Sequence, residues 1–152
     1  MTTDDHVLGL GRILGNLHSL EFAVRMYLWK HEKKVAIQPS LAMDGLRPGD
    51  VVPENAFTNY DTLLTMIRRY NVLVATPLQV AESVVDLRDA LAHGRVSGRT
   101  AAMPLRLLKF GKPAAGSATV THSELMDQGW FEAKVSWVRA QLGKVASALG
   151  AE

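Results

Sequence analysis

The sequence of 152 residues contains no cysteine. Without thiols there is no disulfide framework, no thiolate zinc site and no cysteine nucleophile, which suits a reducing compartment. Long hydrophobic runs are also absent, because no uninterrupted apolar stretch approaches the roughly 20 residues that cross a bilayer. The first residues, Met1 to His6, carry two acidic side chains where a signal peptide is basic. These absences predict a soluble, cytoplasmic protein with no membrane partner.

Several catalytic motifs are missing as well. The chain has no Gly-Lys-Ser/Thr phosphate loop, no His-Glu-x-x-His pair and no Gly-x-Ser-x-Gly elbow, so nothing supports a nucleoside triphosphatase, a zinc protease or an esterase. His31-Glu32 lacks a second histidine four residues further on, and too few residues precede Gly9-x-Gly11 for the strand that a dinucleotide-binding fingerprint needs. We therefore predict no metal site and no cofactor.

The residues that are present indicate one folded domain over 1–152. Hydrophobic residues make up 47% of the chain and charged residues 21%, a balance typical of globular proteins. A chain of this length buries a core of its own. The formal net charge of +2 is too small to identify a partner.

Apolar spacings of three, four and seven predict a first amphipathic helix from Asp4 to about Lys34, capped by Asp4 or Asp5. This helix contains three glycines, which are costly in a helix and so indicate a tight approach to a second helix: Gly9, Gly11 and Gly15. Prolines and glycines predict an irregular connection over about 35–57. A capping-box pattern at 58–61 then predicts a second helix that ends near Asn71.

A third helix is expected to begin at Thr76-Pro77 and to end at His93-Gly94. A β-hairpin is expected over about 103–122, with its strands at 105–110 and 118–121, and a last helix that opens at Ser123 or Asp127. Trp130 and Trp137 widen the apolar stripe of that helix, which favours core or interface roles over ligand stacking. The fold class is therefore mainly α: a bundle of about four long helices, with a small hairpin between the third and the last.

One segment carries a chemically suggestive pattern at the end of the third helix. Arg88 is followed by the polar Asp89, and His93 follows four residues later with Gly94 directly after it. Two other pairs, Arg12 with His18 and Arg25 with His31, have similar spacing but lack the polar second residue and the glycine ending. The segment resembles the Arg-x4-6-His motif of the HEPN-domain superfamily, in which asparagine most often stands at the position of Asp89.

The resemblance implies a HEPN-like helical bundle. Catalytic members of the superfamily are metal-independent ribonucleases that dimerise so that two motifs meet across the interface, and some are toxins or antiviral defence effectors. By this likeness, His93 is the acid–base residue, Arg88 stabilises the phosphate and Asp89 orients or restrains the pair. The implied partners are a second copy of the chain and RNA, with an antitoxin as a further candidate.

These residue types fit RNA cleavage without a metal. Attack of a 2′-hydroxyl on phosphorus needs a base, an acid and positive charge for the phosphorane. Histidine titrates near neutrality, and arginine offers a charged planar fork to phosphate oxygens. At about 100° per residue, Arg88 and His93 lie about 140° apart around the helix axis, so a second copy across a two-fold axis is needed to complete one groove.

From Ala90 to Ser123 the sequence has no acidic residue. Four of the cations in this segment are candidate RNA contacts: Arg95, Arg99, Arg106 and Lys109. Solvated charges on a hairpin explain them equally well.

Two alternatives to an enzyme remain open at this stage. A non-catalytic HEPN-like protein would use Arg88 and His93 to bind a nucleotide or RNA, or to stabilise a dimer interface. A plain helical interaction protein would use His93 only as a favourable charge at the helix end, with Gly94 as a left-handed cap.

Overall fold

The computed structural model describes residues 1–33, 45–98 and 104–150, and these residues are mainly helical. The helices are α1 (Thr3–Lys33), α2 (Leu63–Leu73), the short 3-10 helix η2 (Thr76–Leu78), α3 (Val84–His93) and α4 (Gln128–Gly150). The strands are β1 (Arg95–Ser97), β2 (Leu105–Phe110) and β3 (Val120–Met126). The mainly α class is confirmed. Two of the helices, α1 and α4, are long, whereas α2 and α3 have 11 and 10 residues. Side-chain contacts described below keep residues between α2 and α3 out of a helix.

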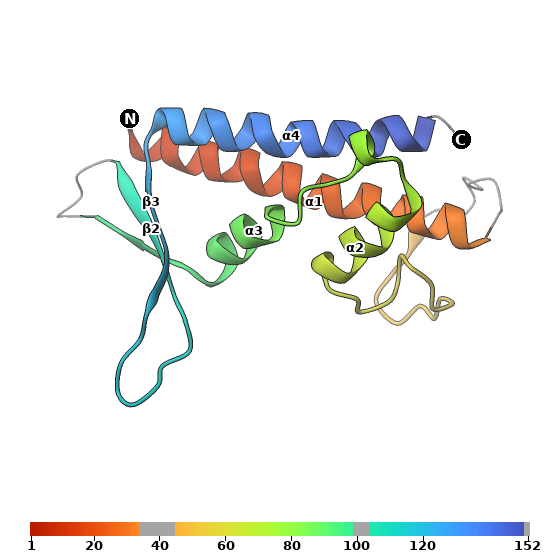
Figure 1. Cartoon of the computed structure of the whole chain (residues 1–152), viewed down its shortest axis with the longest axis horizontal. Helices are drawn as coiled ribbons and strands as arrows, with labels where there is room; N and C mark the ends of the chain where they lie inside the picture. Colours follow the sequence, from red (N-terminus) through yellow and green to blue (C-terminus); the bar gives the residue numbers. More distant parts are fainter. Residues whose placement is uncertain (34–44, 99–103, 151–152) are drawn as a thin grey trace.

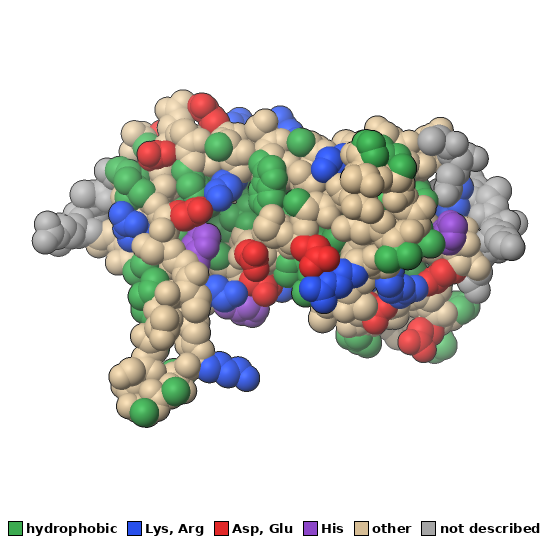
Figure 2. All heavy atoms as spheres, viewed as in Figure 1, with side chains coloured by type: hydrophobic (Ala, Val, Ile, Leu, Met, Phe, Trp, Pro, Cys, Tyr) green, Lys and Arg blue, Asp and Glu red, His purple; other side chains and the backbone are tan. Residues whose placement is uncertain are grey.

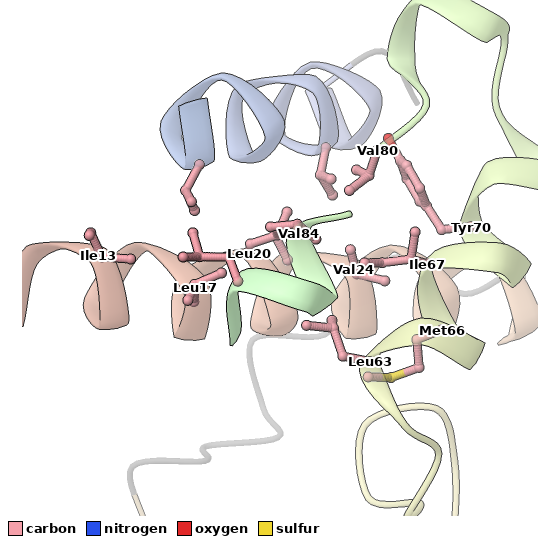
Figure 3. Close-up of a cluster of buried hydrophobic side chains, with 14 of the residues drawn as sticks. Ile13, Leu17, Leu20, Val24, Leu63, Met66, Ile67, Tyr70, Val80 and Val84 are labelled. Carbon is pink, nitrogen blue, oxygen red and sulfur yellow. The ribbon is translucent and has the colours of Figure 1, made fainter. Parts of the chain in front are cut away.

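The two long helices, α1 and α4, lie side by side and run in the same direction, with α2 and α3 packed against one side of the pair (Figure 1). A reciprocal cap begins α1: the Asp5 backbone donates to Thr2 Oγ1 (3.1 Å), and the Thr2 backbone donates to Asp5 Oδ2 (2.7 Å). The cap is thus Thr2, with Asp5 as its acidic partner. Apolar side chains from α1, α2, α3 and α4 meet between these helices to form the core (Figure 3).

Of the three glycines of α1, only Gly9 fits the predicted tight approach within the chain. A Cβ atom at Gly9 would lie 2.5 Å from the Phe131 ring of α4, so any side chain there displaces that ring. Nothing lies within 4 Å of a Cβ at Gly11 or Gly15, which leaves both glycines open on the surface.

The start predicted for α2 is wrong. The helix begins at Leu63 with Thr62 as its N-cap, whose hydroxyl accepts from the Thr65 backbone (3.2 Å). Thr58 instead stabilises the preceding loop, since its hydroxyl accepts from the Asn55 backbone and donates to the Pro53 carbonyl, both at 2.9 Å. Residues 35–44 of the predicted irregular connection lie outside the described residues.

The predicted third helix is also interrupted between Leu78 and Val84. Both ends of the Asn71 side-chain amide bond the backbone of Val80, each at 2.8 Å. The Gln141 side chain of α4 accepts from the Ala81 backbone (3.0 Å). These bonds from other elements hold Val80 and Ala81 out of a helix, and α3 begins only at Val84.

The strands form one antiparallel sheet in the order β1-β2-β3. The predicted hairpin corresponds to β2 and β3, but β3 starts two residues later than expected and continues to Met126, because Ser123, Glu124 and Met126 pair with β2. Ser123 therefore does not open the last helix. Asp127 does, since its carboxylate accepts from the Trp130 backbone (2.8 Å). The β2–β3 hairpin projects well away from the helices (Figure 1).

Tyr70 in the core is expected to make the fold less stable as the pH rises into the alkaline range. Its ring is fully buried, its hydroxyl donates to the Leu78 carbonyl (3.1 Å), and burial, with the neighbouring Tyr27, raises the pKa of Tyr70 to about 12. Because the folded state resists ionisation, this contribution is complete below the ordinary pKa of about 10 and is lost between about pH 10 and 12, at up to about 1.4 kcal/mol per pH unit. In urea unfolding from pH 8 to 12, Tyr70→Phe is expected to lose stability less steeply than the wild type. Parallel profiles would contradict this assignment.

Candidate functional site

Helix α3 presents the motif on the surface. Val84, Leu87 and Ala90 are buried, whereas Arg88 and His93 are exposed. His93 is the last residue of the helix. Side chains about 140° apart on a helix flank opposite sides of the buried stripe, so the expected divergence of Arg88 and His93 follows from the observed helical geometry.

Gly94 fixes the end of α3 by close packing. Its backbone donates to Ala90 O (2.8 Å), and its φ of −73° and ψ of 174° are extended. The left-handed cap considered above is therefore wrong. Glycine is needed because a Cβ would lie 2.2 Å from Ala90 O and 2.9 Å from Leu108 O of β2. The close approach of β2 thus sets the position of His93.

Arg88 and Asp89 form a surface ion pair, with Arg88 Nη1 3.0 Å from Asp89 Oδ1 and side chains 46% and 35% exposed. Among the described residues, His93 makes no hydrogen bond or ion pair. In the described part of the chain, the imidazole of His93 is therefore available, and the guanidinium of Arg88 is paired with Asp89 alone.

The other two Arg/His pairs differ from this one. The Arg25 side chain is only 14% exposed and donates to the backbone carbonyls of Ala56 and Asp61 (3.0 and 3.2 Å), which ties α1 to the loop before α2. Its partner by spacing, His31, stacks on Tyr27. Arg12 and His18 lie exposed on α1. Arg25 therefore has a structural role in attaching the loop to α1, whereas Arg88 on α3 has no such role among the described residues.

The candidate RNA contacts do not form one patch. Strand pairing places Arg95 and Arg106 on the outer face of the sheet, where Arg106 Nη1 donates to Ser123 Oγ (3.1 Å). Lys109 shares the inner face with the buried Leu107 and pairs with His122. Arg99 lies outside the described residues.

A group of polar residues that the sequence did not indicate lies beside α3, on β3 and α4. Glu124 accepts from the indole N–H of Trp130 and from Lys134 Nζ (3.1–3.2 Å), and His122 Nε2 is 3.6 Å from Glu124 Oε2. Burial alone would raise the pKa of Glu124, but the hydrogen bonds from Trp130 and Lys134 and the positive charges of Lys134 and His122 outweigh it and hold the pKa below its ordinary value. Glu124 is therefore a fixed carboxylate that orients its neighbours.

These side chains border a cavity of about 460 Å³ between α3, β3 and α4. Its lining residues are Ser83, Asp86, Leu87, His122, Glu124, Ala133, Lys134 and Trp137. His122 Nε2 is buried without a hydrogen-bond partner in the described structure. In the face shown in Figure 2, histidine and charged side chains gather over α3 and the adjoining part of the sheet. The cavity is thus a second feature on the motif helix itself.

One sequence signal for this group was present. Residues two apart on a strand share a face, so a strand through His122-x-Glu124 places both side chains together. The predicted strand stopped at Thr121, and this hid the pair. The contribution of Lys134, ten residues further on in α4, had no local signal.

Within residues 1–33, 45–98 and 104–150, no group of three or more His, Asp or Glu side chains is placed to hold a metal ion. No helix in the same ranges combines the length and the apolarity needed to span a bilayer. Comparisons with protein-family models, with characterised proteins and with solved structures find no match to this chain.

Proposed function

We propose that this chain is a metal-independent endoribonuclease of HEPN type, with a composite active site at the interface of a cytoplasmic homodimer. The observation that carries the proposal is the state of the motif on α3. Arg88 and His93 are exposed, and His93 has no partner among the described residues. Polar side chains that a fold does not use and that carry suitable chemistry are candidates for function.

The chemistry assigns one role to each group. His93 moves the proton of the attacking 2′-hydroxyl or of the leaving oxygen, and the two histidines of a dimer divide these tasks. Arg88 stabilises the phosphorane by charge and by its planar fork. Asp89, 3.0 Å from Arg88, restrains the guanidinium until a phosphate competes for it.

The dimer is needed because the two motif side chains diverge on one helix. The open glycines of α1 allow close approach of a second copy. Apolar side chains are also exposed on the same helix, among them Val7, Leu8, Leu14 and Phe22. We place α1 and α3 at the interface, Arg95 and Arg106 on the RNA backbone, and an antitoxin-type protein among the physiological partners.

The Arg88–Asp89 ion pair favours a second candidate function. A guanidinium already neutralised by a carboxylate is a weaker phosphate ligand, so a HEPN-like protein that binds RNA or nucleotides without cleaving them is also consistent with this geometry.

The decisive experiment is incubation of the purified protein with mixed RNA in excess chelator, with its mass measured by sedimentation on the same preparation. We expect cleavage that resists the chelator and a mass about twice the 16.6 kDa of one chain. RNA that stays intact but is bound would support the non-catalytic candidate. A monomer at every accessible concentration would remove the composite site.

A further inference from the structure

We propose that the cavity between α3, β3 and α4 binds a single nucleobase that carries an exocyclic amino group. The argument for base binding uses only the cavity, whereas the assignment of the base to an RNA substrate rests on the proposed function. The volume of the cavity, about 460 Å³, lies within the range of small-molecule sites. Leu87, Ala133 and Trp137 form its apolar wall, and Trp137 offers an aromatic surface on which a base can stack.

Some polar groups of the cavity already have hydrogen-bond partners within the chain, and others do not. Glu124 is already engaged by Trp130 and Lys134. His122 Nε2 is buried 3.6 Å from Glu124 Oε2 and makes no hydrogen bond in the described structure, and the Asp86 side chain makes no hydrogen bond or ion pair with the described residues. A buried polar atom left without a hydrogen bond is unfavourable, so a ligand that reaches His122 gains by satisfying it. Asp86 and His122 are thus the two groups that a ligand meets.

Charge selects the kind of ligand. Two carboxylates line the cavity, and Glu124 is paired with the lysine of the lining, Lys134 (3.1 Å), so the negative charge of Asp86 is left without a counter-charge among the described residues. Such a site disfavours a phosphate and favours a hydrogen-bond donor beside Asp86. A carboxylate accepts from the exocyclic amino group of a base. Adenine, guanine and cytosine have this group, and uracil does not.

The position on α3 connects the base to the motif. Asp86 and His93 are seven residues apart, which is about two turns, so they lie on the same side of the helix about 10 Å apart along its axis. A base held at Asp86 therefore leads its strand along this side toward His93. This placement makes the cavity a specificity subsite, with the phosphate outside it.

The test is a titration of the full-length protein with the nucleoside monophosphates AMP, GMP, CMP and UMP, followed through the side-chain nitrogen resonances of His122 by NMR. The three amino-bearing nucleotides are expected to shift the Nε2 resonance of His122 and to bind at least about tenfold more tightly than UMP. Inosine monophosphate, which lacks the amino group of AMP, is the matched ligand and should bind as weakly as UMP.

Asp86→Asn should remove this preference, lowering the affinity for AMP about tenfold and leaving that for UMP unchanged. Glu82→Gln is the control, because Glu82 precedes α3 and pairs with Arg68 outside the cavity. Equal affinity for AMP and inosine monophosphate, an unshifted His122, or no effect of Asp86→Asn would overturn the proposal. Nucleotide binding without RNA cleavage would refute only the proposed function, and cleavage without nucleotide binding only this inference.

Discussion

Replacing His93 by alanine is expected to lower the rate of RNA cleavage by about 10²–10⁴-fold, the usual contribution of a general acid–base residue. Because His93 is exposed and unpartnered among the described residues, the variant should keep its helical content and form the proposed dimer as the wild type does. Arg88→Ala should reduce cleavage severely for a different reason, the loss of charge at the phosphorane. Single-turnover cleavage of a labelled RNA in chelator, with circular dichroism and sedimentation on the same samples, measures each effect.

The matched control is His18→Ala, which removes an exposed helical histidine of the rival Arg12/His18 pair and should leave cleavage unchanged. A loss of only about twofold at His93 would be too small for the proposed role. Melting of the fold in His93→Ala would show that the residue acts as a helix end instead.

Replacing Arg25 by alanine is expected to lower the free energy of unfolding by about 3 kcal/mol, the largest loss of stability among the variants considered. Its side chain is 14% exposed, and its guanidinium donates to the carbonyls of Ala56, Asn59 and Asp61, so its removal leaves several acceptors without their donor. The loop before α2 would then lose its attachment to α1. Urea unfolding at neutral pH measures the change in the free energy of unfolding.

Arg68→Ala is the control for this effect. Arg68 forms an ion pair with Glu82, with Nη2 2.9 Å from Oε2, and its side chain is 61% exposed. Exposed ion pairs contribute only about 0–1 kcal/mol, so this variant should be nearly as stable as the wild type. A loss at Arg25 no larger than the loss at Arg68 would contradict the structural role of Arg25.

The extent of α1 was predictable from the sequence because its periodicity is local, although its cap is Thr2 and not Asp4 or Asp5. Its observed start, Thr3, lies one residue before the expected Asp4, and the helix continues to Lys33, the last described residue before the gap. The start of α3 was not predictable in this way, since Gln141, 60 residues away, holds the backbone of Ala81. The boundary between β3 and α4 was misplaced for the same kind of reason, because pairing with β2 extends the strand through Ser123.

In the candidate site, too, the residues close in sequence were predictable and those brought together by packing were not. Arg88, Asp89 and His93 stand within six residues of one another, so a linear pattern was enough to select them. The cavity that adjoins them draws on α3, β3 and α4, and its aromatic wall, Trp137, looked like an ordinary core position of an amphipathic helix. Only the packing of these three elements shows that Asp86 and His122 face one space.

The pairing of α1 with α4 has a consequence for biosynthesis. The partner of the first helix is the last one, and residue 150 follows residue 33 by 117 positions. At a translation rate of about 5–20 residues per second, the apolar face of α1 waits roughly 6–25 s for α4 to emerge. During that interval the apolar face of α1 lacks the covering that α4 provides in the folded chain. The nascent chain is therefore a candidate client for holding chaperones, and ribosome-bound chains that end before Gln128 should be more sensitive to proteolysis than the released protein.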